Sequence, residues 1–258
     1  MRFPVRKILS PIVALFVLFV LLGLWQASSL IWTFPAYFYT PTEIGSAWVA
    51  SLDANMWQAT WDTLFRAGVG FLIGTILALP IGAITARLRR VENTVEPYIG
   101  FFYALPKISL LPVLVVWLGY TDTARITMIA ISVFFPVYVY MNAGVKGINP
   151  DYLKVASNLG AGRWTTFRDV LVPAAAPMAM AGLRVGLAIS LIVTFATEVV
   201  GQSPNGLGRI IQDGFIAVAY SEMYAGIIMF ALIGLAIDLA LRLLTRNSRT
   251  LWGEAELA

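Results

Sequence analysis

The chain has 258 residues, of which 59% are apolar and only 12% are charged. Soluble domains carry about 25% charged residues, so this composition excludes a soluble globule and indicates a polytopic membrane protein. The sequence contains no cysteine and no histidine, which excludes disulfides, Cys/His zinc sites, thiol nucleophiles and histidine acid–base catalysis.

Six apolar stretches are long enough to cross a hydrocarbon core of about 30 Å, which takes roughly 20 residues of helix. In chain order they cover residues 8–24, 67–86, 98–118, 126–145, 175–200 and 223–241. The third stretch contains Lys107 and the sixth contains Asp238, whereas the fifth contains Arg184 and Glu198. We therefore expect an all-α membrane protein whose six transmembrane helices form a single domain over residues 1–258.

Positive charge is distributed unevenly over the two faces of this arrangement. Thirteen of the 18 Lys and Arg residues lie on one side, three lie on the other, and two lie within spans. Because cytoplasmic loops carry the excess of positive residues, the richer side is predicted to be cytoplasmic, and both termini fall on it. Its residues are Arg2, Arg6, Lys7, Arg87, Arg89, Arg90, Lys146, Lys154, Arg163, Arg168, Arg242, Arg246 and Arg249; the other side has Arg66, Arg125 and Arg209.

The first apolar stretch has a second interpretation. A basic start, an apolar run and the small residues Ala27, Ser28 and Ser29 also fit a cleaved secretion signal. The run is long for such a signal, and its removal would leave five spans and disturb the charge pattern. A retained helix is therefore favoured.

The predicted outer face has two sizeable segments. Residues 28–66 begin rich in Trp, Tyr, Phe and Pro, which favours an interfacial aromatic belt over a ligand-stacking surface, and continue as a short surface helix from about Thr42. Residues 201–222 contain the turn-rich run Gly-Gln-Ser-Pro-Asn-Gly-Leu-Gly, followed by an apolar segment at 210–220 that is too interrupted to span. We expect that segment to lie at the outer surface or to fold back.

The predicted cytoplasmic face has one distinctive loop, at 149–173. Asn149, Pro150 and Asp151 are residue types of a helix N-cap, first position and first turn, and Gly160 is placed to end that helix. A second amphipathic stretch follows before Pro173. From the residues alone, this basic helix–glycine–helix unit fits equally a membrane-surface hairpin held by anionic lipid and a docking site for a cytoplasmic protein. Its first helix has one apolar face made of Tyr152, Val155, Ala156 and Leu159.

This loop resembles the "EAA" loop of the permease subunits of binding-protein-dependent ABC importers. Ala156 matches the second alanine of that pattern, Gly160 its glycine and Pro173 its proline. Lys154 stands where the family usually has glutamate and Val155 replaces the first alanine, which argues against an acidic contact there but not against the shape of the loop. Residues 60–245 carry the resemblance, which is most specific to the sulfonate, taurine and nitrate permeases and importers of thiamine-precursor pyrimidines. Further matching fragments are 63–71, 104–107, 111–119, 182–184, Glu198 and 205–208.

The resemblance implies half of a type I ABC importer in a bacterial inner membrane. Two copies of the chain would form the pore as a homodimer, two cytoplasmic ATPases would dock on the loop, and an extracytoplasmic binding protein would deliver a small solute such as a sulfonate, taurine, nitrate or a heteroaromatic precursor. The chain has neither a Walker A motif nor GxGxxG, so ATP and Mg²⁺ are expected in the partner ATPase, with no cofactor, metal, catalytic residue or nucleic-acid partner for this chain. ATPase coupling falls to Asp151, Lys154, Ala156, Leu159, Gly160, Ala161, Gly162 and Arg163.

Three charged residues within spans are candidates for the translocation path or its gate, because charge in a bilayer is costly unless it faces a cavity or a partner. Lys107 and Arg184 each lie about ten residues, roughly 15 Å, from the cytoplasmic end of a span. Either cation could line a path for an anion. In the alternative interpretation, Lys107 extends its amine to the membrane surface and Arg184 holds helices together. For Arg184 this structural role is favoured. Glu198 could gate the outer mouth or pair with Arg209, and a structural role is favoured. Asp238 is expected to pair with Arg242.

Two other classes of function compete with the permease interpretation. A stand-alone secondary transporter of a small organic anion often shows inverted repeats with broken helices, and residues 1–120 and 125–258 show no convincing internal similarity. An intramembrane enzyme would need catalytic groups, and the chain lacks histidine, cysteine and a carboxylate pair within one span. A secondary transporter would also leave the cytoplasmic loop unexplained.

Overall fold

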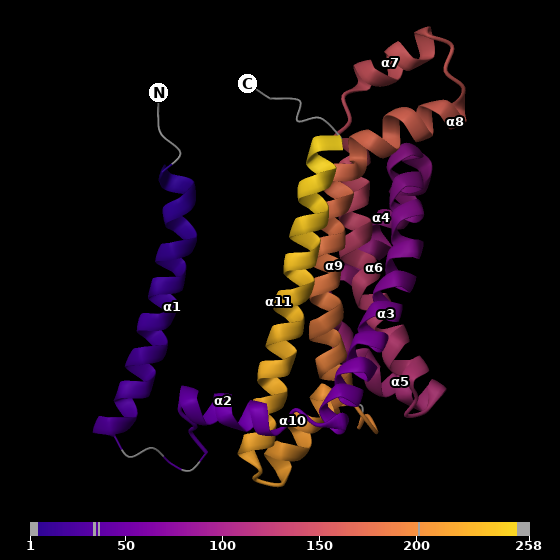
Figure 1. Ribbon diagram of the computed structural model, residues 1–258. Helices are drawn as coiled ribbons and strands as arrows, with labels where there is room; N and C mark the ends of the chain where they lie inside the picture. Colours follow the sequence, from indigo (N-terminus) through magenta and orange to yellow (C-terminus); the bar gives the residue numbers. More distant parts are fainter. Residues whose placement is uncertain (1–4, 33–34, 36, 201, 252–258) are drawn as a thin grey trace.

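All regular structure in the described part of this computed structural model is helical (Figure 1). The structure describes residues 5–32, 35, 37–200 and 202–251, and all side chains in those ranges except those of residues 5–12, 14, 242 and 244–251. Two of the helical elements are single turns of other types, the 3₁₀ turn η1 and the π turn η2. The elements are α1 (Val5–Ile31), α2 (Pro41–Ala50), α3 (Ala54–Arg87), α4 (Arg89–Ala104), η1 (Lys107–Leu110), α5 (Leu111–Leu118), α6 (Asp122–Lys146), α7 (Pro150–Asn158), α8 (Arg163–Thr166), η2 (Phe167–Leu171), α9 (Val172–Val200), α10 (Leu207–Ile216) and α11 (Tyr220–Leu251).

Four stretches of described helix are long and apolar enough to cross a membrane. They are α3, α6, the continuous stretch Arg163–Val200, and Tyr220–Leu241 of α11. A fifth candidate is the pair formed by α4 and η1–α5, whose two parts meet at an angle of 89°. Leu15–Ile31, the part of α1 in which every side chain is described, is a shorter apolar stretch. Length and composition therefore support four or five spans in the described chain.

The predicted third span, 98–118, is a broken helix. Helix α4 ends at Ala104, and Leu105 adopts an extended backbone with φ −65° and ψ 140°. The cause is Pro106, because a proline disfavours helical geometry in the residue before it. Lys107 consequently lies in the 3₁₀ turn after the break, at the bend of the segment, and the helical path resumes at Leu111.

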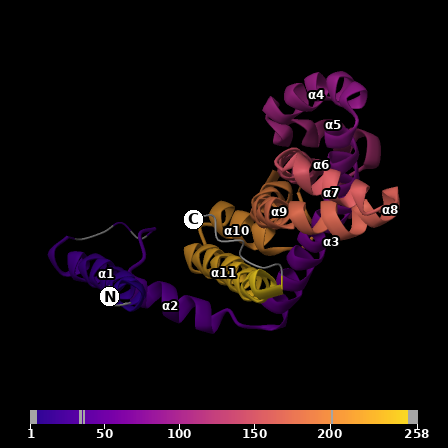
Figure 2. The ribbon, with the colours of Figure 1, turned by 90° about the horizontal axis from the view of Figure 1, so that it is seen from above.

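Helix α6 packs between α3 and α9, which lie against it through glycines (Figures 1 and 2). A Cβ atom at Gly70 of α3 would come within 2.5 Å of Ile129 Cγ2, and one at Gly182 of α9 within 2.6 Å of Tyr140 Cβ. Glycine at these positions lets the helix backbones approach closely, which is how helices associate tightly in a membrane. The two glycine pairs spaced four residues apart, Gly70/Gly74 in α3 and Gly182/Gly186 in α9, therefore both lie at contacts with α6.

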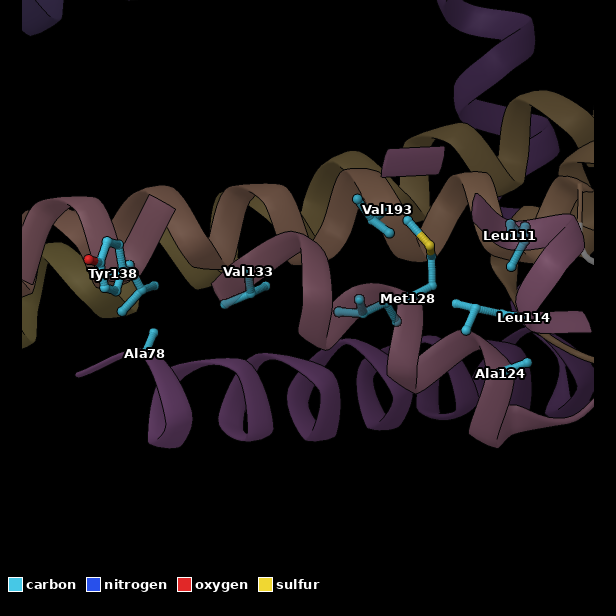
Figure 3. Packing of buried hydrophobic residues seen from close by; sticks show 10 residues of the cluster. Ala78, Leu111, Leu114, Ala124, Met128, Val133, Tyr138 and Val193 are labelled. Carbon is cyan, nitrogen blue, oxygen red and sulfur yellow. The ribbon is translucent and has the colours of Figure 1, made fainter. Parts of the chain in front are cut away.

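The largest buried cluster also centres on α6 (Figure 3). Met128, Ile129, Val133 and Val137 of α6 have no exposed surface. Leu111 and Leu114 of α5 join the same cluster, so the segment after the bend is anchored to the three-helix core by apolar contacts. The whole cluster is Ala78, Leu111, Leu114, Ala124, Met128, Ile129, Val133, Val137, Tyr138 and Val193.

The two ends of the helix bundle carry different elements (Figure 1). Helices α7 and α8 lie at one end, which we call the α7 end, together with the beginning of α1 and the last turns of α11. Helices α2 and α10 lie at the other end, the α10 end. The short helix predicted from about Thr42 is confirmed as α2, whose capping box joins Thr40 and Glu43; the donors of Thr40 lower the pKa of the Glu43 carboxyl.

The aromatic segment before α2 packs partly against α11. Tyr39 stacks on Tyr224 of α11 with ring centres 5.3 Å apart, and the Tyr224 hydroxyl donates to the Tyr37 carbonyl at 3.0 Å. Helix α1, in contrast, stands apart from α3, α6, α9 and α11 (Figure 2), and most of its described large apolar side chains, such as Phe16 and Phe19, are exposed, whereas Trp25 is half-buried. The apolar segment expected at 210–220 folds back: α10 ends at Ile216 and the chain reverses into α11.

Two glycines of α3 test the packing against α6. A Cβ added at Gly70 would overlap Ile129, whereas one added at Gly68 would meet nothing within 4 Å. We expect Gly70→Ala to destabilise the protein by about 1–3 kcal/mol, since overpacking a close contact forces backbone shifts. Gly68→Ala is expected to stay within about 0.5 kcal/mol of the parent. Thermal unfolding in detergent measures both, and equal midpoints for the two variants would contradict this packing.

Candidate functional site

The first helix of the loop at the α7 end, α7, begins and ends at the residues that the sequence predicts. The Asn149 side chain accepts the Asp151 N–H at 2.9 Å, which caps the first turn of α7. At the other end, Gly160 has a φ of +75°. The Gly160 N–H donates to Ser157 O and the Ala161 N–H donates to Ala156 O, both at 3.0 Å, which is the Schellman arrangement. This left-handed position favours glycine because a side chain there is strained.

The predicted apolar face of α7 is not packed against the rest of the chain. Only Ala156 is buried, whereas Tyr152, Val155 and Leu159 are 60%, 55% and 81% exposed. Beyond Gly160, Trp164 is also exposed and stacks on Phe167 at 5.7 Å between ring centres. The loop therefore presents apolar side chains outward at the α7 end.

Charged residues of the loop are also at its surface. Lys154, at the position where glutamate was expected, forms an ion pair with Asp151 at 2.8 Å. Both side chains are largely exposed, so the pair contributes little to stability. Arg163 begins α8 just after the exposed residue Gly162.

Helix α8 is joined directly to a membrane-spanning helix. Residues Arg163–Val200 form one continuous helical stretch, in which the π turn Phe167–Leu171 precedes Pro173. Proline has no N–H to donate to the preceding turn, and the wider π turn falls where the regular hydrogen bonds are interrupted. Leu171 is buried and packs with Ala175 and Val145. No loop therefore separates α8 from α9.

Near the α10 end, Glu198 of α9 is fully buried and held by three donors. The Thr63 hydroxyl lies 2.9 and 3.0 Å from its two carboxylate oxygens, Arg66 Nη1 lies 2.9 Å away, and the Gly208 N–H donates at 2.8 Å. Burial of a carboxylate is tolerated when it is paired and hydrogen-bonded in this way. The alternative pairing of Glu198 with Arg209 is wrong, because Arg209 pairs with Asp213, four residues further along α10, at 2.6 Å.

Arg66 extends this interaction to two further elements. Its Nε donates to Asp122 at the start of α6 at 2.7 Å, and its Nη1 donates to the Asn205 carbonyl at 2.8 Å. Asp122 also pairs with Arg125 at 3.2 Å, which brings two guanidinium groups to one carboxylate. We call these residues, Thr63, Arg66, Asp122, Arg125 and Glu198, the ionic network.

The ionic network explains the glycines at the start of α10, Gly206 at the N-cap and Gly208 in the first turn. Gly206 has a φ of +131°, and a Cβ there would lie 2.5 Å from the Glu198 carboxyl group. A Cβ at Gly208 would lie 2.7 Å from Glu198 Cβ. The start of α10 can lie against the carboxylate only without side chains at these positions. Sequence analysis did not predict the partners of Glu198 in this network. One signal was present, because Arg66 and Arg125 are two of the three basic residues on the predicted outer face.

Lys107 lies at the bend of the broken helix and faces a hollow. Its Nζ donates to Tyr103 O at 2.9 Å and lies 4.9 Å from the centre of the Tyr103 ring and 5.3 Å from that of Phe135. Contact with two aromatic faces stabilises a cation away from water. The hollow, of about 390 Å³, is otherwise lined by Tyr103, Pro106, Ile108, Ser132, Pro136, Ile189 and Val193.

Arg184 and Glu198 are not near this hollow. Arg184 lines a different one of about 430 Å³, between α9 and α11, which it shares with Asp238 and mainly apolar residues. The structure therefore separates the three candidate path residues into three places. The expected pairing of Asp238 with Arg242 lies outside the described residues, because the Arg242 side chain is not described.

The fold and the loop define a class of protein: an all-helical membrane protein with a short capped helix pair at one end of its bundle. Its fold is similar to that of a chain of the inward-facing MetNI methionine ABC transporter, with a TM-score of 0.65 at 21% identity over 74% of this chain and 94% of that one. The family described as "Binding-protein-dependent transport system inner membrane component" matches residues 70–250. The chain belongs to this family.

Two curated relatives are similar over much of the chain. A putative aliphatic sulfonates transport permease of Bacillus subtilis, SsuC, is 31% identical over 72% of this chain and 67% of its own length. The taurine transport system permease TauC of Escherichia coli is 29% identical over 80% of this chain and 74% of its own length. The protein is thus a multi-pass inner-membrane permease subunit of a binding-protein-dependent ABC importer, and nucleotide binds to the ATPase subunit.

The ionic network generates a stability prediction. Arg66 keeps its pair with Asp122 in Glu198→Ala, but the buried Thr63 hydroxyl and Gly208 N–H lose their acceptor, and a buried donor left without a partner costs about 1–3 kcal/mol. Arg209→Ala removes a partner of an exposed pair and is expected to cost at most about 1 kcal/mol. Thermal unfolding of both purified variants in detergent tests the difference. A Glu198→Ala midpoint no lower than that of Arg209→Ala would show that the network is not stabilising.

Proposed function

We propose that two copies of this chain form the translocation path of an importer for a small organic anion of the sulfonate or taurine type. In this proposal α1 and the broken α4–α5 segment are spans, which makes six in all, and the α7 end with both termini faces the cytoplasm. The proposal is supported by the excess of Lys and Arg on the loop side and by the similarity to SsuC and TauC. The exposed apolar surface of α1 fits a helix that faces lipid or the second copy.

The observation that carries the coupling part of the proposal is the exposed apolar face of α7. Tyr152, Val155 and Leu159 are mounted on a helix with a defined N-cap and a Schellman ending, so the face is presented in one fixed orientation. A rigid helix of this kind can occupy a cleft of an ATPase and move with it. Closure of the ATPase would then shift α8 and the continuous α9 as one body. ATP binding can drive this shift only if the loop contact differs between the two states.

Lys107 supports an anionic substrate. A broken helix near the middle of a membrane is a common place for a transport site, and a charge there is expensive unless it faces a cavity. Lys107 meets both conditions, since it lies at the break and lines the hollow of about 390 Å³. The apolar walls of the hollow suit the carbon skeleton of a small sulfonate, and the amine suits its charged group. Glu198 has a structural role in this proposal because all its surface is buried.

Gly160 and Gly162 provide a matched pair for the coupling role. Neither has an atom within 4 Å of an added Cβ, but only Gly160 has a positive φ, of +75°. Gly160→Val is therefore expected to destabilise the end of α7 by about 1–3 kcal/mol, the cost of the strained backbone conformation. We expect it to lower ATP-dependent uptake and co-purification of the cognate ATPase by about fivefold or more. Gly162→Val is the control for backbone strain, because Gly162 has a φ of −68°, and its free energy of unfolding is expected to stay close to that of the parent. Parental uptake and ATPase co-purification by Gly160→Val would show that the loop is not the coupling element.

Lys107→Met tests the anionic substrate. Loss of a charge-assisted contact of about 1.5–3 kcal/mol is expected to lower uptake at subsaturating substrate by about tenfold or more. Lys107→Arg keeps the charge and is expected to retain most of the activity. Uptake of labelled taurine, methanesulfonate and nitrate by vesicles that contain the assembled transporter and binding protein measures the effect. Uptake of an anion by Lys107→Met at the parental rate would exclude the path role of Lys107.

A further inference from the structure

A second large hollow lies at the α7 end, between the loop and the ends of the spans. Its volume is about 610 Å³. One wall is made by α3 and α6, and the other by α7, α8 and the turn that leads into α9. It lies behind α7, whose exposed apolar face points away from the chain. Its residues are Pro80, Ala83, Ile84, Arg87, Leu88, Met141, Val145, Leu153, Ser157, Ala161, Arg163, Thr166, Phe167, Leu171 and Val172.

The polar groups of this hollow are two cations and two hydroxyls. Arg87 comes from the last turn of α3 and Arg163 from the first turn of α8, and Ser157 and Thr166 supply the hydroxyls. Within the described part of the chain, neither Arg87 nor Arg163 forms an ion pair, whereas Lys154, Lys146 and Arg168 all do. No acidic residue is among the described residues that line the hollow. Its charge is therefore complementary to an anion.

The apolar part of the hollow extends toward the interior of the membrane. Its lining on α3 runs from Arg87 back to Pro80, which is about two helical turns or roughly 10 Å along the axis. On α6 the lining includes Met141 and Val145, just before the end of the helix at Lys146. The hollow thus has cations where the spans end and apolar walls deeper in the spans. This distribution matches an amphiphile better than a free ion, which would leave the apolar walls without a partner.

We propose that this hollow binds one anionic phospholipid per chain. Arg87 and Arg163 hold the headgroup phosphate, with Ser157 and Thr166 available as further donors, and the first carbons of the acyl chains lie against Pro80, Ala83 and Met141. Guanidinium groups suit phosphate because they offer several parallel donors. Among anionic amphiphiles, phospholipid is the abundant one at a membrane surface, and basic pockets beside spans are known places for its headgroups. The proposal concerns binding of lipid and does not depend on the identity of the transported solute.

A lipid in this position would join the loop to the spans. Arg87 belongs to α3 and Arg163 to α8, so a phosphate held by both connects two elements that are separated in sequence. The lipid would then restrict the movement of the loop on the side that faces the spans. The outward apolar face of α7 would remain available to the ATPase. The lipid composition of the membrane would in this way affect how firmly α7 and α8 follow the spans.

Two double variants with equal loss of charge test the proposal. Arg87→Gln/Arg163→Gln removes both cations of the hollow, and Arg90→Gln/Arg168→Gln removes two from the same end of the protein outside it. The full-length chain is purified in mild detergent, stripped of lipid and titrated with phosphatidylglycerol or phosphatidylcholine. Native mass spectrometry counts the bound lipid, and thermal unfolding confirms that each variant is folded.

In the titration, we expect the parent and the Arg90/Arg168 variant each to bind one phosphatidylglycerol molecule in preference to phosphatidylcholine. The Arg87/Arg163 variant is expected to bind it at least about tenfold more weakly, because it lacks both charge-assisted contacts. Ala161→Phe, which narrows the hollow without a change of charge, is expected to weaken binding too. Equal losses in the two double variants, equal binding of phosphatidylcholine, or full displacement of the lipid by glycerol 3-phosphate at the same concentration would each overturn the proposal.

Discussion

The burial of Glu198 against Arg66 is the constraint on which the arrangement of the spans depends. A carboxylate without exposed surface must have partners, and its partners here come from α3, from Gly208 in the first turn of α10 and, through Arg66 and Asp122, from α6. These contacts fix the rotation of three helices about their axes at the α10 end. They also explain why Gly206 and Gly208 are required, since any side chain there would displace the carboxylate.

Between the two ends, α3, α6 and α9 behave as packed rods. Their glycine contacts leave little room for one helix to slide on another, so displacement of one helix must move its neighbours. At the α7 end the loop is continuous with α9 through the π turn. The protein thus combines a fixed cluster at one end with an outward apolar helix at the other, and the proposed coupling to ATP hydrolysis uses α9 as the connection between them. The hollow behind α7 lies at the joint of this connection, where an occupant would have most effect on its stiffness.

Local sequence features predicted the local structure well. The Asn149 cap, the ending at Gly160 and the surface helix after Thr40 each follow from a few neighbouring residues, and the apolar stretches mark the long helices. Pro106 was visible in the sequence, but periodicity and length alone treat 98–118 as one span, and the break appears only when the effect of proline on the residue before it is considered.

The ionic network could not be predicted in the same way. Thr63, Asp122 and Glu198 are more than fifty residues apart in sequence, and only the fold brings them together. Sequence proximity instead favoured Arg209 as a partner for Glu198, although Arg209 is held by Asp213 within α10. The Lys107 hollow was likewise hidden, because the bend turns a residue of a supposed straight span toward α6 and α9.

A double-mutant cycle on Arg66 and Glu198 tests the central constraint most directly. Arg66→Met, Glu198→Met and the double variant are compared with the parent by thermal unfolding in detergent. If the pair holds the spans in register, the double variant is more stable than the sum of the single effects predicts, by about 1–3 kcal/mol, because neither charge is then left buried without the other. Additive effects of the two substitutions would show that Arg66 and Glu198 act independently and would contradict the account.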